Sequence, residues 1–483
     1  MNEQLTPERY LALAVTGPAA DQLALMLLAL VLGAIGVILL RDHPKMLAVI
    51  WLVGLAFVPI WLGVTFRVYL APSVIIAVFV GIALFPTQGV RLGKADMVML
   101  LMLMLSLATV VLGGASRPAL LDVFLQWLPP LAMGRVLAQR LGLNWLMKAI
   151  GIVFAIAAAL AVVEFITGYN SFVLLSRGNS LYGTWGSLQA RGSIVRAEGA
   201  FGHAIALGAS LAAAIPLALA TDLTARAKSV IVLLLLAGTL VSFSRAAMLC
   251  AVTGLVLTIV FQRSGLSARL RALFTALLFG VAFIALPYVT AVFDAAGSEA
   301  AGSAAYRGNL LSLVPDMAPL GISPAAYRAP DGTLYMRDFH SIDSTLILHG
   351  LSYGWLPLVV TSSLLLAAIV CVVTRRASAP TVALVAQIPA LATVALITQY
   401  AAMIWMIVGM TLFAPVLKDL GGRDSAAGPR RRHRYGDDGF PPPRLRVLSG
   451  PNPVAEPVHP SSSDGDAVAP GRASASSLEG SGA

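Results

Sequence analysis

The chain consists largely of long apolar runs that alternate with short polar segments. Two examples are Asp21–Leu40 (DQLALMLLALVLGAIGVILL) and Met97–Gly113 (MVMLLMLMLSLATVVLG). About 20 mostly apolar residues are needed to cross the hydrocarbon core of a bilayer, and only helices or closed barrels satisfy their backbone groups there. Because the runs show no alternation with a period of two, the pattern predicts an all-α, polytopic membrane protein.

The same length requirement predicts about 13 transmembrane helices, or about 12 if the first run pairs with an N-terminal re-entrant segment. Together they form a membrane body at residues 21–420, preceded by an N-terminal segment at residues 1–20. The spans are expected at residues 21–40, 46–63, 68–87, 97–113, 119–137, 145–167, 199–220, 228–243, 245–262, 271–293, 346–373, 380–398 and 400–417.

Residues 421–483 differ in composition from the membrane body. They are rich in Gly, Pro, Ser and Ala and include a basic run at Arg430–Arg434. Such a segment has too little apolar surface to fold, so a disordered cytoplasmic tail is expected.

The positive charges alternate between successive loops. One set of short loops carries the Lys and Arg residues and is therefore expected to be cytoplasmic. Two long segments, residues 168–198 and 294–345, then face the other side, which in a bacterial inner membrane is the periplasm; short helices are expected in the second. The cytoplasmic set comprises Arg41, Lys45, Arg91, Lys94, Arg135, Arg140, Lys148, Arg226, Lys228, Arg263, Arg269, Arg271, Arg375, Arg376, Lys418 and Arg423.

Composition excludes several other classes of protein. Hydrophobic residues make up 58% of the chain and charged residues 12%, about half the charged fraction of soluble domains. The net charge of +10 is explained by cytoplasmic loops and the tail, so no nucleic-acid partner is expected. Cys250 and Cys371 both lie inside apolar runs and are interpreted as core residues, not as a disulfide or a metal site.

Several arginines fall on the predicted outer side, where the positive-inside rule disfavours them. The planar guanidinium group suits phosphate oxygens, so a set of outward arginines at membrane level indicates a lipid-linked pyrophosphate substrate. The alternative is that these side chains snorkel or pair with nearby acids. The set comprises Arg67, Arg117, Arg177, Arg191, Arg196, Arg245, Arg307, Arg328 and Arg337.

Two outer segments carry arginine at the start of an apolar run. In RAEGAFGHAIALG, Arg196 and His203 are seven residues apart and share one helical face if a helix begins that early. In VSFSRAAML, Ser244 and Arg245 divide a long apolar run into a helical hairpin, with the arginine at the interface or facing an aqueous cavity.

The second long segment ends in FHSIDSTLILHG, Phe339–Gly350. A neutral imidazole at His340 can accept a proton from a sugar hydroxyl, and Asp343 can orient that imidazole or contact the sugar. His349 is expected to be buried and structural. Upstream, Leu310, Leu313 and Val314 predict a short amphipathic helix on the membrane surface.

These segments resemble the O-antigen ligase and polymerase family, bacterial enzymes that transfer lipid-linked glycans at the periplasmic face. The matching pieces are RAEGAFGH, SRAAM, and a loop with an Arg, a Pro-Leu-Gly element, a His and a Gly pair. In this chain the loop elements are Arg307, Pro319-Leu320-Gly321, His340, and Gly350 with Gly354.

The resemblance implies glycosyl transfer without metal or cofactor. His340 would act as general base, and Arg245 and Arg307 would hold undecaprenyl pyrophosphate and stabilise its charge as the bond to the sugar breaks. Further substrate contacts are expected from Arg191, Arg196, His203 and Asp343. Pyrophosphate is a good leaving group, so positioning and charge stabilisation are the main requirements.

The family's ligases tend to have Asn directly after the His, whereas Ser341-Ile342-Asp343 follows here. The chain is therefore interpreted as a polymerase that joins undecaprenyl-pyrophosphate-linked repeat units into O-antigen or exopolysaccharide at the inner membrane. One alternative is an O-antigen ligase that transfers glycan to lipid A core. Another is a non-catalytic transporter or flippase, which is disfavoured because the polar groups concentrate in outer loops, with Asp122 and Glu164 as exceptions. Expected partners are the glycan-bearing lipid, the membrane and polysaccharide export proteins.

Overall fold

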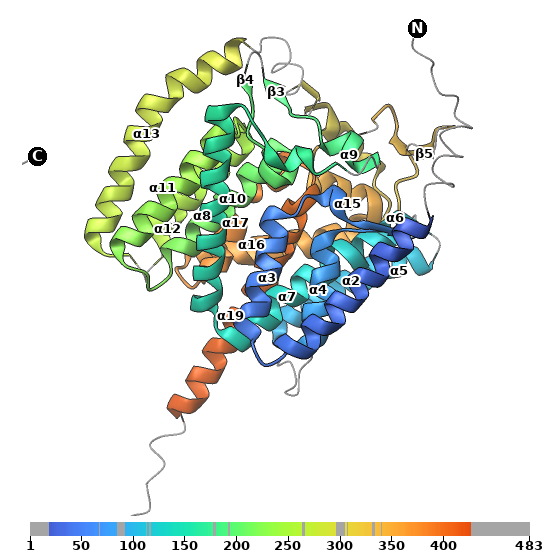
Figure 1. Ribbon diagram of the computed structural model, residues 1–483, viewed down its shortest axis with the longest axis horizontal. Helices are drawn as coiled ribbons and strands as arrows, with labels where there is room; N and C mark the ends of the chain where they lie inside the picture. The colour runs from blue at the N-terminus through green and yellow to red at the C-terminus, as the bar shows by residue number, and fades with distance from the viewer. Residues whose placement is uncertain are drawn as a thin grey trace, which may run out of the picture. The chain divides into compact units, whose positions relative to one another are not determined.

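The computed structural model is mostly helical (Figure 1). It describes residues 19–66, 68–84, 92–112, 114, 117–176, 180–191, 194–262, 266–295, 305–306, 308–330, 334–339 and 341–426. Four of its helical stretches are long and apolar enough to cross a membrane: Lys94–Val111, Ala119–Leu141, Leu143–Thr167 and Trp355–Val373. The chain is therefore a multi-pass helical membrane protein, while the larger number of spans stays a prediction. The predicted tail at residues 421–483 lies almost wholly outside the described residues.

The first helices follow the predicted apolar runs, but α3 ends earlier and α4 begins later than expected. The chain forms α2 (Ala19–Leu40), α3 (Pro44–Phe57), the 3₁₀ helix η1 (Ile60–Leu62), the hairpin β1–β2 (Val64–Phe66, Val68–Leu70), α4 (Pro72–Ala83) and α5 (Lys94–Val111). The expected spans 46–63 and 68–87 are wrong at these ends. Val58 is extended because a proline follows it, and Pro72 starts α4 at a position where its missing N–H costs nothing.

A π-helical segment interrupts the next span. It joins α6 (Arg117–Leu121) to α7 (Leu128–Leu141) as η2 (Asp122–Trp127). The N–H of Leu128 donates to the carbonyl of Val123, five residues back. The widening precedes Pro129 and Pro130, which have no N–H to donate to the carbonyls four residues earlier.

The middle of the chain forms a bundle around α10, whose residues are almost all buried. In Figure 1, α8, α10, α11 and α12 lie side by side, in agreement with their contacts. Small residues allow this close packing: a side chain at Gly238 would collide with Ala158 and Leu211. The elements are α8 (Leu143–Thr167), η3 (Ser171–Leu174), α9 (Ser180–Trp185), β3 (Ala190–Arg191), β4 (Ile194–Val195), η4 (Gly199–Phe201), α10 (Ala204–Leu219), α11 (Ala225–Val241), α12 (Arg245–Phe261) and α13 (Ala268–Ala295).

The last third of the chain contains two helix breaks. The expected span 346–373 is two helices divided at Gly354, whose φ of +96° suits glycine and which packs against the backbone of Ala318 and Leu320. The expected span 380–398 is likewise two short helices. The elements are η5 (Leu310–Asp316), β5 (Ala326–Arg328), β6 (Leu334–Met336), α15 (Thr345–Tyr353), α16 (Trp355–Val373), α17 (Ala379–Ala386), α18 (Ile388–Thr393) and α19 (Thr398–Ala426).

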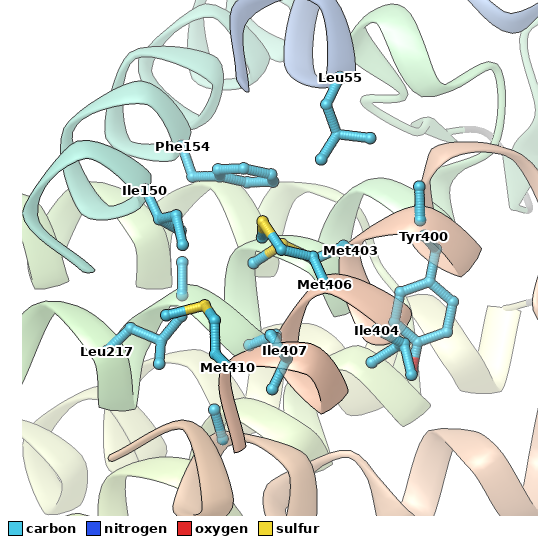
Figure 2. Packing of buried hydrophobic residues seen from close by; sticks show 14 of the residues in the cluster. Leu55, Ile150, Phe154, Leu217, Tyr400, Met403, Ile404, Met406, Ile407 and Met410 are labelled. Carbon is cyan, nitrogen blue, oxygen red and sulfur yellow. The ribbon is translucent and has the colours of Figure 1, made fainter. Parts of the chain in front are cut away.

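Helix α19 supplies much of the core. Figure 2 shows Met403 and Met406 of this helix near Phe154 of α8, and Met410 near Leu217 of α10. The flexible thioether side chains fill the irregular spaces between these helices.

Against α7, helix α19 packs at backbone contact. A side chain at Gly134 would collide with the carbonyl of Met406, and one at Gly409 with the carbonyl of Leu131. The two glycines therefore set the distance between the helices.

One arginine that was assigned to a cytoplasmic loop lies inside the bundle instead. Arg135 is on α7 and only 4% exposed, and its Nε and Nη2 atoms donate to the carboxylate of Asp96 on α5 at 3.0 and 3.2 Å. The same carboxylate accepts the N–H of Gly93, so it also caps the start of α5. At this end of the bundle Lys148 forms an ion pair with Asp222.

Candidate functional site

The candidate site lies at the loop end of the bundle, defined as the described residues within 168–203, 242–245 and 305–345. Figure 1 shows β3, β4, α9 and β5 at this end. Its helices α10, α12 and α15 all begin here, so their positive dipole ends and their capping residues are gathered on the same side of the protein.

Glu164, at the end of α8, fixes the loop that leads into α10. Its two carboxylate oxygens accept the N–H groups of Glu198 and Gly199 at 3.0 and 2.8 Å. The side-chain amide of Asn170 donates both to Glu164, at 2.8 Å, and to the carbonyl of Gly199, at 3.0 Å. These charge-assisted bonds hold the segment that contains Arg196 and His203 against the end of the membrane helix.

Arg196 is buried and bonded to other parts of the loop end. It is 5% exposed; its Nε donates to the carbonyl of Ser242 at 2.8 Å and its Nη1 to the side chain of Gln189 at 3.4 Å. The following N–H, of Ala197, donates to Val241. The guanidinium is thus committed to the turn between α11 and α12. The expected helical face shared with His203 is wrong, because α10 begins only at Ala204.

The predicted hairpin at Ser244 is confirmed, and it presents Arg245. Ser244 caps α12 by accepting the N–H of Ala247 at 3.2 Å, and Arg245 is the exposed first residue of that helix. Arg191 donates to the carbonyl of Phe243 at 3.5 Å. Phe243 has a φ of +46°, a strained conformation for a non-glycine residue. Three predicted arginines, from the first long loop and from the hairpin, therefore meet at one turn.

His203 and Glu198 are both affected by burial in this loop. His203 is the N-cap of α10, where its Nδ1 accepts the N–H of Ile205 at 3.2 Å. Burial, helped by the positive charge of Arg196, lowers the pKa of His203 to about 4, so its ring is neutral at neutral pH. Burial raises the pKa of Glu198 to about 7. The hydrogen bond from the backbone N–H of Gln189 and the positive charge of Arg196 act in the other direction, because both favour the ionised carboxylate.

Arg307 and His340, the other two predicted catalytic residues, lie outside the described residues. Their neighbours are described: the hydroxyl of Tyr306 donates to the carbonyl of Ser341, and the hydroxyl of Ser341 donates to Asp343 at 3.1 Å. Asp343 is half-buried beside the N-cap of α15. The segments that flank Arg307 and His340 are thus joined directly.

The second long loop packs against helix α15 and also forms contacts within itself. The expected amphipathic helix exists as η5, but Leu310 and Leu313 are buried in a cluster with Ile347 and Leu351 of α15, so its apolar face does not lie on lipid. Arg337 pairs with Asp316 at 2.6 Å, as the ion-pair alternative for the outer arginines predicts.

The expected burial of His349 is confirmed. Its side chain is buried, with Nε2 3.3 Å from the hydroxyl of Thr361, and its ring lies 5.6 Å from that of Trp127 and 5.2 Å from that of Tyr353. His349 therefore packs in the contact between α15 and α16, while its structural role stays a prediction.

Gln399, at the start of α19, connects distant parts of this end and was missed in the sequence. Its amide nitrogen donates to the carbonyls of Val58 and Ala200 at 3.1 and 2.8 Å. The polar pair Thr398-Gln399 between two apolar runs was the available signal. Nearby, the N–H and hydroxyl of Thr345 both donate to Val394, which ties α15 to the end of α18.

A groove of about 400 Å³ with mainly apolar walls opens between α5, α15, α16, α17 and α19. At the loop end it reaches Thr345 and Leu346, two and three residues after Asp343, and at the other end it reaches Arg376. Within the described part of the chain, no three His, Cys, Asp or Glu side chains are grouped so as to hold a metal ion. Comparisons with known protein families, with curated proteins and with solved structures found no match for this chain.

Proposed function

We propose that the protein is a membrane-embedded glycosyltransferase that polymerises undecaprenyl-pyrophosphate-linked repeat units into O-antigen or exopolysaccharide. It would act at the periplasmic face of a bacterial inner membrane. The observation that supports this most is the gathering of Arg191, Arg196 and Arg245 at the turn Ser242–Ser244.

The electrostatics of that turn favour an anionic ligand. A helix N-terminus carries a partial positive charge of about half a unit, which favours a bound anion there. Arg245 occupies that position on α12, and Arg191 and Arg196 bring two further positive charges to the preceding turn. Guanidinium groups and helix N-terminal N–H groups are both good ligands for a diphosphate.

The apolar groove supports a lipid-linked substrate. Its walls at Leu346, Leu364 and Trp405 could hold the prenyl chain, while its end at Thr345 lies beside the segment that carries Asp343. A diphosphate at the loop end with its chain in this groove would put the scissile sugar bond at the membrane surface, near the segment that carries Asp343.

The proposed reaction needs one bond to form and one to break. The acceptor hydroxyl oxygen attacks C1 of the donor sugar as the bond from C1 to the diphosphate oxygen breaks. His340 takes the hydroxyl proton, and undecaprenyl pyrophosphate leaves with the bonding electrons, stabilised by Arg245 and Arg307. Asp343 would orient the imidazole or contact the acceptor, and Arg196 would hold the turn that carries Arg245. An O-antigen ligase would use the same chemistry with lipid A core as acceptor.

The test measures polymer formation from isolated undecaprenyl-pyrophosphate-linked repeat units by the purified protein in lipid nanodiscs. Arg245→Ala and His340→Ala should each lower the rate by about 100-fold or more. Arg226→Ala is the matched control, because Arg226 is also an exposed arginine in the first turn of a helix, at the other end of the adjacent helix α11. If both Arg245→Ala and His340→Ala form polymer at the normal rate, the proposal is wrong.

A deletion strain separates the two glycosyltransferase alternatives. Loss of a polymerase leaves single repeat units on the lipid carrier or on lipid A core. Loss of a ligase leaves long polymer on undecaprenyl pyrophosphate. Loss of a flippase would leave the lipid-linked glycan on the cytoplasmic side. If the protein is a flippase, its His340→Ala variant should behave as the unaltered protein.

A further inference from the structure

A second cavity, of about 270 Å³, lies outside the loop end as defined above and is not used by the proposed reaction. It is distinct from the apolar groove because its walls carry several polar groups. The polar side chains include Tyr69, Asp122, Gln126, Thr398 and Gln399, set among apolar side chains such as Trp51.

One wall holds polar atoms that have no partner among the described residues. Gln399 is only 4% exposed; its amide nitrogen is occupied by two carbonyls, whereas its Oε1 atom accepts no hydrogen bond. The buried hydroxyl of Thr398 is in the same state, and that residue has a φ of +46°. An unsatisfied buried polar group costs about 1–3 kcal/mol. Both residues line the cavity, so a ligand there would gain these hydrogen bonds once the two side chains turn toward it.

The π-helical segment also contributes to the lining. Gln126 donates to the Oδ1 atom of Asp122 at 2.7 Å, so the second carboxylate oxygen of this cavity-lining residue is not used by that bond. Tyr69 accepts the N–H of Gly63 at 2.9 Å and keeps its own O–H as a donor. π-Helical turns frequently occur at functional sites, because they turn side chains out of the regular helical register.

These groups suit a neutral ligand that is rich in hydroxyls. The lining residues include acceptors at Asp122 and Gln399 and a donor at Tyr69, and none of the described ones is Lys or Arg. A single carboxylate is too few ligands for a bound cation of the oxygen-loving kind. At about 30 Å³ per water, the cavity corresponds to about nine waters, which is room for one sugar ring.

We infer that this cavity binds a single neutral sugar residue of the glycan; that the sugar belongs to a transferred glycan rests on the proposed function. The cavity is joined to both loop systems. Gln399 bonds to Ala200, four residues after Arg196. On the other side, the hydroxyl of Tyr353 in α15 donates to the carbonyl of Ala119, one helical turn before Asp122. A sugar held here would therefore set the register of the chain that enters between the two loops.

Thiol labelling in the cavity tests binding without requiring transfer. Ser73 lines the cavity, and cysteine is close to serine in size. Ser73→Cys is made in the full-length chain after both native cysteines have been removed by Cys250→Ser and Cys371→Ser. The probes are methyl glycosides of the sugars in the host's own surface polysaccharide. We expect at least one to slow labelling by a small methanethiosulfonate several-fold, and Asp122→Asn or Gln399→Leu to abolish that protection. If Ser73→Cys does not fold, Ala71→Cys, outside helix α4, takes its place.

The matched control is Ser171→Cys, an exposed serine that does not line the cavity. Its labelling should be unaffected by any glycoside. Unchanged labelling of the cavity cysteine by every glycoside would overturn the sugar site, even if polymer formation proceeds. Protection of the cavity cysteine in a protein that forms no polymer would leave the sugar site standing and contradict the proposed function.

Discussion

The Nε atom of Arg196 lies 2.8 Å from the carbonyl oxygen of Ser242, across 46 residues of sequence. This bond fixes the turn that presents Arg245, so Arg196→Gln should act through position and not through direct contact with substrate. Loss of a buried hydrogen bond from a charged donor is expected to lower the free energy of unfolding by about 1.5–3 kcal/mol. Thermal unfolding in detergent measures it, and Arg226→Gln, an exposed arginine on α11, should show almost no change.

The ion pair between Asp96 and Arg135 gives a second prediction. Both side chains are about 5% exposed, so removing the carboxylate leaves the buried guanidinium without its ion-pair partner. Asp96→Asn should therefore destabilise the protein by about 3–5 kcal/mol. Asp42→Asn is the control, since Asp42 and its partner Arg41 are largely exposed. Equal melting temperatures for the two variants would contradict the role assigned to the buried pair.

Glu198 predicts a pH dependence. Because burial raises its pKa from 4.5 to about 7, the folded chain binds this proton more tightly than the unfolded chain. The contribution of Glu198 to the free energy of unfolding therefore falls as pH rises from about 4.5 to about 7. Glu198→Gln removes that loss. The melting temperature of the variant minus that of the unaltered protein should therefore increase between about pH 5 and about pH 8. A pH-independent difference would show that Glu198 titrates normally.

His203 acts in the opposite sense. Its lowered pKa, about 4, makes stability rise as pH increases from about 4 to about 6.5. Since His203 is present in both proteins of the preceding comparison, its contribution cancels in the difference between them.

The contact between α7 and α19 gives a packing prediction. In Gly134→Ala the new methyl group would meet the carbonyl of Met406, and overpacking of this kind costs about 1–3 kcal/mol. Gly36→Ala adds the same methyl group to α2 where no atom lies within 4 Å, so it should be neutral or stabilising because alanine favours helix. Melting temperatures that move in the same direction would contradict the close approach of α7 and α19.

The helices were largely predictable because a membrane helix must be apolar over its whole length. The expected spans 145–167 and 245–262 match α8 and α12 within two residues. The errors fall where proline or glycine ends a helix inside an apolar run, as at Gly354, since hydropathy alone does not register a change in backbone direction. The hairpin β1–β2 was missed for the same reason.

The candidate site was predictable in part. The position of Arg245 at a helical hairpin followed from a charge inside an apolar run, whereas the burial of Arg196 did not, because its partner is a backbone carbonyl 46 residues away. Glu164 likewise binds backbone N–H groups, which have no sequence signature. The roles of Arg307 and His340 stay predictions.

The π-helical turn at Asp122–Trp127 amounts to one extra residue in an otherwise ordinary helix. Deleting Phe124 should let the segment close into regular α-helical geometry, which changes the direction of the side chains in the widened turn. The carboxylate of Asp122 would then leave the cavity, while the partners of Arg135 would be untouched. Deletion of this one residue should thus give a folded protein that no longer binds the proposed sugar. A compensating insertion upstream of α7 should restore sugar binding.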